Sequence, residues 1–252
     1  MARAFVPSVA LWRTIEARAV EAAFAKYQFQ RPILDLGCGE GKFAAIVFPR
    51  NGIDVGLDLD DDMIRDALST GTYASAVRGD GRRFPFADCS FATVFSNSVI
   101  EHIDELDPVL REVARVLKPG GRFVATVPVP GFKDGLFVKR KLDSMGLRRA
   151  GALYGEAINA KLHHVNLLEQ DSWRLRLRSC GLELVDGVPY LGERAVAAWD
   201  RLSIEYFIRS RLKLPVPSRS DVVRSAIESP GNAPYGALLV VAEKPDKDAS
   251  PA

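Results

Sequence analysis

Residues 33–42, ILDLGCGEGK, place a short apolar run directly before three alternating glycines, Gly37, Gly39 and Gly41. A strand that leads into glycines and then into a helix is the nucleotide-binding arrangement of doubly wound sheets. Glycine allows the turn to tighten and leaves no side chain between a ligand and the backbone. We therefore expect a ligand to approach the backbone closely at this stretch.

The spacing of these glycines separates the ligands that such a loop can hold. The phosphate-binding motif G-x-x-x-x-G-K-[ST] needs a second glycine where Lys42 stands. The dinucleotide motif G-x-G-x-x-G needs its third glycine at the same position. The pattern that remains is D-x-G-x-G-x-G, from Asp35 to Gly41. The phosphate loop is excluded, and an NAD-dependent oxidoreductase is disfavoured.

A carboxylate closes the next strand-like run. Asp58 lies about 20 residues after Gly37, the spacing at which an acid accepts hydrogen bonds from ribose hydroxyls. An ionised carboxylate only accepts hydrogen bonds, so it suits a diol and repels a phosphate. Its alternative role is to cap the helix expected at 61–68, for which Asp60 and Asp61 are better placed.

Strand-like and helical segments alternate along the chain. The expected strands are 33–36, 53–57, 74–77, 91–96, 122–127, 182–188 and 237–243. The expected helices are 8–29, 42–48, 61–68, 108–117, 169–179 and 196–212. This alternation predicts an α/β fold whose mostly parallel sheet carries helices on both faces. Residues 129–166 and 190–235 contain glycine, proline and aromatic residues without regular spacing, and we expect irregular insertions there, with one helical stretch in the second.

The composition is that of an ordinary globular chain, with 47% hydrophobic and 26% charged residues in 252. The net charge of +2 and the even spread of Lys and Arg argue against a nucleic-acid partner. Three widely separated cysteines indicate a reducing compartment rather than a disulfide framework. No signal peptide is expected and no apolar run reaches about 18 residues, so the expected location is cytoplasmic, without a transmembrane segment.

Four segments carry a resemblance to a known family. They are ILDLGCGEGKFA (33–44), VGLDLDDDMI (55–64), VRGDGRRFPFADCSFATVFSNSVIEHI (77–103) and LREVARVLKPGGRFVATVP (110–128). In this order they resemble the class I S-adenosylmethionine-dependent methyltransferases, of the small-molecule type. The resemblance implies a doubly wound, seven-stranded, mostly parallel sheet, a Rossmann-like methyltransferase fold in which ALLVVAEKP supplies the final antiparallel strand.

The same resemblance implies the methyl donor, S-adenosyl-L-methionine, and the product, S-adenosyl-L-homocysteine. The implied cofactor residues are Asp35, Gly37, Cys38, Gly39, Gly41, Asp58, Leu59, Asp80, Gly81 and Asn97. Asp35 and the glycines would hold the methionine portion, and Asp58 the ribose hydroxyls. Asp80 and the backbone of Gly81 would meet the adenine amino group, unless Asp80 only forms a turn with Gly81. Asn97 would lie near the transferable methyl group.

The reaction needs few catalytic groups. Displacement at a sulfonium methyl has a good leaving group, so positioning can supply most of the acceleration. A general base is needed only where the acceptor must lose a proton. The candidates are His163 and His164, one of which would face the methyl group, and His102, which lies near the acceptor or only packs against a helix. No metal ligands are predicted.

We expect one methyltransferase domain over residues 1–252. Its parts are a helical segment at 1–31, a cofactor-binding half at 32–128, lid insertions at 129–166 and 190–235, a final strand at 236–244 and a flexible tail at 245–252. The apolar face in the second insertion packs on the sheet, forms a dimer contact, or covers an apolar or amphipathic acceptor with peripheral membrane contact. The chain is expected to be a monomer or a homodimer.

These features favour a small-molecule methyltransferase. A macromolecular acceptor is disfavoured, because no basic appendage is present and FSNS (95–98) replaces an Asn/Asp-Pro-Pro-aromatic motif after the fourth strand. A lipid-like acceptor stays open. The alternative to an enzyme is a non-catalytic partner subunit that keeps the same fold. The intact glycines and acids of the expected cofactor site argue against this alternative.

Overall fold

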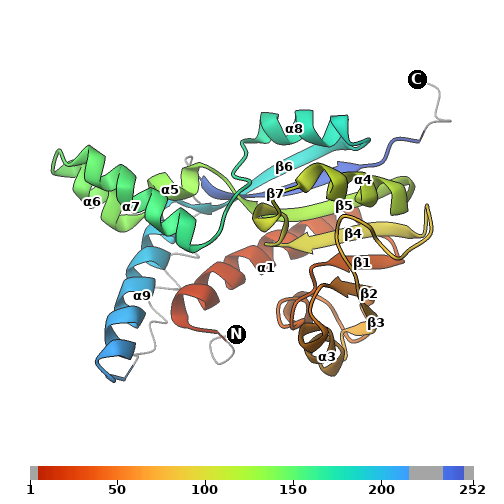
Figure 1. The fold of residues 1–252 in the computed structure, drawn as a ribbon, viewed down its shortest axis with the longest axis horizontal. Coiled ribbons are helices and arrows are strands. Elements are labelled where there is room, and N and C mark those ends of the chain that lie inside the picture. The colour runs from red at the N-terminus through yellow and green to blue at the C-terminus, as the bar shows by residue number, and fades with distance from the viewer. Residues whose placement is uncertain (1–4, 216–234, 247–252) are drawn as a thin grey trace.

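The computed structural model describes residues 5–215 and 235–246 (Figure 1). The expectations for residues 1–4, for 216–234 in the second insertion and for the tail from 247 lie outside the described residues. Within the described ranges, no helix combines the length and the apolar character needed to cross a membrane.

The sheet confirms the predicted architecture. Its strands are β1 (Ile33–Leu36), β2 (Ile53–Asp58), β3 (Tyr73–Arg78), β4 (Phe91–Asn97), β5 (Leu117–Pro128), β6 (Glu183–Gly192) and β7 (Tyr235–Glu243). They form one seven-stranded sheet in the order β3-β2-β1-β4-β5-β7-β6. Strands β1 to β5 pair in parallel, and β7 runs antiparallel to both β5 and β6. This is the strand arrangement that the resemblance to the methyltransferases implies.

Helices cover both faces of the sheet (Figure 1). They are α1 (Pro7–Tyr27), α2 (Ala44–Val47), α3 (Asp61–Ser69), the 3-10 turn η1 (Ile100–His102), α4 (Leu106–Val116), α5 (Gly131–Gly135), α6 (Phe137–Ser144), α7 (Arg148–Lys161), α8 (Gln170–Ser179) and α9 (Glu193–Arg211). One apolar core lies between the sheet and α4 and α8, and a second lies between the sheet and α1 and α9. Strand β7 contributes to both cores, because successive side chains of a strand point to opposite faces of the sheet. Leu238 and Val240 lie in the first core, whereas Leu239 and Val241 lie in the second.

Two elements near the glycines differ in length from the prediction. The helix expected at 42–48 is the single turn α2, because the loop keeps left-handed backbone as far as Gly41 and Pro49 follows closely. The strand expected from residue 122 begins at Leu117, so the KPGG segment belongs to β5, with an irregular register opposite β4. Neither difference moves the carboxyl ends of the strands.

The prediction of an irregular insertion at 129–166 is wrong, because α5, α6 and α7 occupy most of it. The glycines that suggested loops serve helix packing instead. A Cβ at Gly151 in α7 would clash with the Asp143 carboxylate and lie 3.1 Å from the Lys139 carbonyl, both in α6. Small residues therefore let α6 and α7 approach closely, as the two helices do in Figure 1.

Asp200 of α9 joins these helices. It is fully buried, and its carboxylate accepts hydrogen bonds from the Val138 backbone N–H at 3.0 Å and from the Tyr154 hydroxyl at 2.6 Å. The first bond satisfies a free N–H at the start of α6, and the second reaches α7. The two insertions that are far apart in sequence thus share one polar anchor.

Candidate cofactor and acceptor site

A cavity of about 320 Å³ opens at the carboxyl ends of β1, β2 and β4. The strand order reverses here, because β1 lies between β2 and β4, and open α/β sheets bind ligands at such points. The lining includes these predicted cofactor residues: Asp35, Gly37, Cys38, Gly39, Gly41, Asp58 and Asn97. Most of the predicted set therefore converges on one cavity.

Hydrogen bonds hold the glycine loop against the end of β2. The N–H groups of Gly37 and Cys38 donate to the Leu57 carbonyl at 2.8 and 3.0 Å. The Gly39 N–H donates to Asp58 Oδ2 at 2.8 Å. The loop is thereby shaped by its own chain before any ligand enters.

The three glycines differ in what a side chain would meet. A Cβ at Gly37 would lie 2.6 Å from Val99 Cγ1, and a Cβ at Gly41 would lie 2.9 Å from the Ala67 Cα. At Gly39, whose φ is +51°, a Cβ would meet no atom within 4 Å. Packing therefore requires glycine at the first two positions, whereas Gly39 leaves open space at the cavity wall.

Asp35 is a buried acid in the lining. Its Oδ2 accepts a hydrogen bond from the Tyr73 hydroxyl at 2.6 Å. Burial raises the pKa of Asp35 to about 7 against the opposing effect of that hydrogen bond, and the charge of Asp58 adds to the rise. A cation bound in the cavity would favour the ionised form. Burial also raises the pKa of the Cys38 thiol, which stays neutral.

Two roles are open to Asp58 from the sequence: binding the ribose hydroxyls and capping the helix that follows. Asp58 accepts from the Gly39 and Asp60 N–H groups, the second at 3.1 Å, and so faces the loop. Asp60 caps α3, because its carboxylate accepts from the Asp62 and Met63 N–H groups at 2.7 and 3.4 Å. Asp58 is therefore free of the capping role, and each of its oxygens has a lone pair left for a hydroxyl.

The residues assigned to the adenine do not join the cavity lining. Leu59 is 64% exposed. The Asp80 carboxylate is held by Arg82 through a hydrogen bond of 2.7 Å and by the Arg82 backbone N–H at 2.8 Å. A Cβ at Gly81 would lie 3.6 Å from Leu36, which places this glycine beside the end of β1. Their role in cofactor binding stays a prediction.

Asn97 belongs to a buried polar network that sequence reasoning missed. Its Oδ1 accepts from Arg13 Nη1 at 2.7 Å, and Arg13 also pairs with Glu16 at 2.5 Å. Glu16 is completely buried, and accepts from the Tyr190 hydroxyl at 2.9 Å and the Ser98 hydroxyl at 3.0 Å. Burial alone would raise the pKa of Glu16, but Arg13, followed by Asn97 and Tyr190, brings it below its usual range. The wall beside Asn97 is therefore rigid and charged.

The sequence offers little indication that Arg13 and Glu16 would form a buried network. Arg13 and Glu16 stand three residues apart within the apolar pattern of α1, beside Leu11, Trp12 and Ile15. Such a pair usually marks a solvated helix face. Only the packing of α1 on β4 and β6 shows that this pair faces inward.

The structure separates the three histidines. His164 is partly buried, its ring 5.9 Å from that of Phe132 and 5.5 Å from that of His102. His163 is exposed and has a positive φ of 54°, and its carbonyl lies 3.0 Å from His102 Nδ1. His102 is 41% exposed. His164 is thus the inward-facing member of the pair, while a role in catalysis stays a prediction for all three.

Glu101 is a further site candidate that was not predicted. Its side chain is 2% exposed, and burial raises its pKa to about 8. Its charge acts on Arg13 and Tyr190, so it lies close to the polar network. Burial, followed by the nearby His102, lowers the pKa of His164 to about 4, which keeps this imidazole neutral near pH 7.

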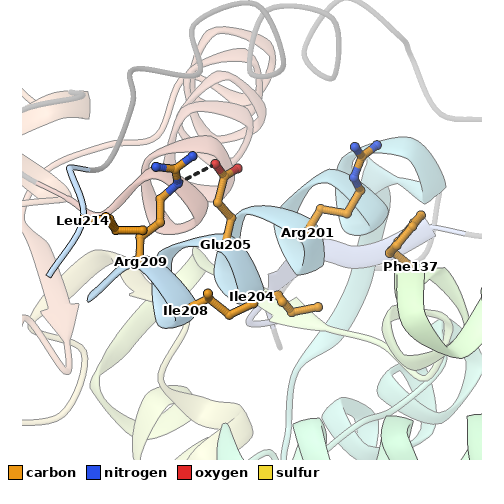
Figure 2. A pocket seen from close by; sticks show the side chains of 7 residues that line it. All are labelled: Phe137, Arg201, Ile204, Glu205, Ile208, Arg209 and Leu214. Atoms are coloured by element: carbon orange, nitrogen blue, oxygen red, sulfur yellow. Dashed lines mark hydrogen bonds and ion pairs between the residues drawn. The ribbon is translucent and has the colours of Figure 1, made fainter. Parts of the chain in front are cut away.

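Helix α9 has two different faces. Val196 and Leu202 are buried in the core shared with α1, so part of the predicted apolar face packs inside the molecule. The other face carries a second cavity of about 480 Å³ (Figure 2). It is lined by Phe137, Arg201, Ile204, Glu205, Ile208, Arg209 and Leu214. This cavity lies away from the glycine loop and shares no lining residue with the first.

Comparisons with known proteins agree with this geometry. A family model described as a methyltransferase domain matches residues 34–125. The malonyl-[acyl-carrier protein] O-methyltransferase of Erwinia pyrifoliae is 29% identical over 153 residues, which cover 49% of this chain and 58% of that protein. The demethylmenaquinone methyltransferase of Desulfitobacterium hafniense is 30% identical over 155 residues, which cover 56% and 59%. The chain spans less than two thirds of the length of these relatives.

Solved structures extend the likeness of the fold over nearly the whole chain. An S-adenosylmethionine-dependent methyltransferase from Thermotoga maritima has a TM-score of 0.58 at 17% identity, with 92% of this chain and 90% of that chain covered. Phosphoethanolamine N-methyltransferase 2 of Haemonchus contortus, solved with S-adenosyl-L-methionine, has a TM-score of 0.57 at 18% identity, with 95% and 57% covered.

Proposed function

We propose that the chain is a class I S-adenosylmethionine-dependent methyltransferase that transfers a methyl group from S-adenosyl-L-methionine to a small-molecule acceptor; the methyltransferase-domain match over residues 34–125 and the shared fold support this. One observation carries the proposal. The glycine loop ends at a cavity at the topological switch point, with Gly39 leaving open space and Asp35 buried beside it. The transferred group is the methyl of the cofactor sulfonium.

The charge of the cavity favours this cofactor over a phosphate-bearing nucleotide. Asp35, Glu40 and Asp58 line it together with Arg13 and Lys42, and Lys42 is paired with Glu40. S-adenosyl-L-methionine carries an ammonium and a sulfonium cation, which acids stabilise, and a diol, which an ionised carboxylate accepts from. We assign Asp35 to the methionine end and Asp58 to the ribose.

The polar network on the other side of the cavity would position the acceptor. Arg13 and Asn97 line the cavity, and their mutual hydrogen bond and the buried Glu16 hold them in place. Fixed side chains of this kind reduce the entropy lost on reaching the transition state. His164 does not line the cavity, but it lies beside Glu101, whose charge acts on Arg13, and from there it would bind the acceptor or accept its proton.

We also propose that the helical insertions cover the acceptor. Phe132 of α5 and Trp199 of α9 meet Trp12 of α1, with ring centroids 5.5 and 6.3 Å from the Trp12 ring. His164 contacts the same cluster through Phe132. Aromatic walls beside a few polar groups suit an apolar or amphipathic small molecule.

Isothermal titration calorimetry with S-adenosyl-L-methionine and S-adenosyl-L-homocysteine tests the proposal. We expect saturable binding of one cofactor per chain. Turnover is then followed as release of S-adenosyl-L-homocysteine with a panel of acceptors. The relatives' names suggest a malonyl-[acyl-carrier protein] and a demethylmenaquinone as members of that panel. Absence of cofactor binding would refute the proposal and favour a non-catalytic partner subunit.

A further inference from the structure

Three potential metal ligands meet beside the polar network. One donor atom each from Glu101, His102 and His164 lies within 4.8 Å of the other two. Glu101 and His102 belong to η1, whereas His164 follows α7, so the chain brings them together from distant positions. This distance in sequence explains why no metal ligands were predicted. The full chain contains only three histidines, and two of them supply donors here.

Two of these donor residues carry buried polar atoms that lack a hydrogen bond. Among the described residues, neither Glu101 Oε2 nor His164 Nδ1 has a hydrogen-bonding partner. Leaving a buried polar group unpaired costs about 1–3 kcal/mol, so such groups are rare in native structures. A bound cation would satisfy both atoms at once.

The backbone holds the three residues in this arrangement. The Val165 and Asn166 N–H groups donate to the Glu101 carbonyl at 2.8 and 3.0 Å, which ties the segment after α7 to η1. His102 Nδ1 lies 3.0 Å from the His163 carbonyl. A hydrogen bond from the Nδ1–H to this carbonyl fixes the imidazole tautomer. The lone pair of Nε2 is then available to a metal ion, as in metal-bound histidines.

We propose that Glu101, His102 and His164 bind a divalent transition-metal ion, with Zn²⁺ as the best match to two imidazoles and a carboxylate. Zn²⁺ bonds of about 2.0–2.2 Å place tetrahedral ligand atoms about 3.4 Å apart, so donor atoms that now lie within 4.8 Å of one another would move closer on binding. Three protein ligands leave a coordination position for another molecule. If the proposed function holds, that molecule is an oxygen-bearing acceptor.

The test uses the full chain without a histidine tag, stripped with a chelator and titrated with Zn²⁺ by calorimetry and with Co²⁺ by visible absorption. We expect one ion per chain. His164→Ala and Glu101→Gln should each weaken binding at least about tenfold. His163→Ala is the matched control, because this exposed residue contributes only its carbonyl, and its affinity should stay within about twofold.

Circular dichroism confirms that each variant is folded, and the nearly isosteric Glu101→Gln decides the question if His164→Ala unfolds. Absence of saturable binding by the wild-type chain, or equal affinity in Glu101→Gln, would overturn the metal site and leave a carboxyl–imidazole proton relay. Titration with S-adenosyl-L-methionine is run in parallel. Metal binding without cofactor binding would support the site while refuting the proposed function.

Discussion

Replacing Gly39 with alanine tests whether the loop backbone contacts the cofactor. Gly39 has a φ of +51°, and a Cβ there would meet no atom within 4 Å. Left-handed backbone costs a residue with a side chain about 1–2 kcal/mol. In a chain of this size that loss lowers the melting temperature by roughly 2–8 °C. The protein should therefore stay folded, while the new methyl group occupies space that the ligand needs.

Gly120→Ala separates the backbone cost from the ligand contact. Gly120 also has a left-handed backbone, with φ +71°, and open space around its Cβ position. It lies at the amino end of β5, whereas the cavity is at the carboxyl ends of the parallel strands. The two variants should lose similar stability in thermal unfolding. Only Gly39→Ala should raise the Kd for S-adenosyl-L-methionine, by at least about tenfold, or roughly 1.4 kcal/mol.

Two results would refute this reasoning. If Gly39→Ala binds the cofactor as tightly as Gly120→Ala, the loop backbone does not contact the ligand. If Gly39→Ala unfolds far below Gly120→Ala, Gly39 has a packing role that its open surroundings do not show. Calorimetry and thermal unfolding on the same preparations distinguish the two.

Three further predictions concern buried acids. Because burial raises the pKa of Asp35 from 3.8 to about 7, its contribution to stability is full below pH 3.8 and is lost progressively as the pH rises to about 7. The free energy of unfolding in urea, measured without ligand across this pH range, should therefore fall less steeply in Asp35→Asn than in the wild-type chain. Tyr73→Phe leaves the Asp35 carboxyl without its donor and should lower the free energy of unfolding by about 1–3 kcal/mol, where an unchanged urea midpoint would contradict the bond. Asp200→Ala removes the anchor of Val138 and Tyr154, so amide exchange should accelerate in α6 and α7 while the β1 amides stay protected.

The cofactor half of the fold followed from local rules. Short apolar runs bounded by glycine and acidic residues predicted the parallel strands, and the left-handed turns at Gly37 and Gly41 depend on the residue type itself. The carboxyl ends of neighbouring parallel strands lie at one edge of the sheet, and Asp35, Asp58 and Asn97, which the resemblance assigned to the cofactor, line one cavity there.

The helical insertion shows where local rules failed. Glycine within residues 129–166 suggested loops, because glycine weakens an isolated helix by about 1 kcal/mol. In the structure Gly151 allows close contact with α6, and Asp200 from a distant segment satisfies the start of that helix. Both compensations come from residues outside the local window, so no pattern in the segment reports them.

The sequence by itself determined the class of fold and the position of the glycine loop, while the methyl donor that the resemblance implies stays a proposal. The tertiary structure alone decided which polar residues face inward. Arg13 and Glu16 form a buried pair because α1 packs on the sheet, and His164 joins Glu101 because two backbone N–H groups tie its segment to η1. Periodicity reports which face of a helix is apolar, whereas the burial of a charge depends on partners that only the folded chain brings within reach.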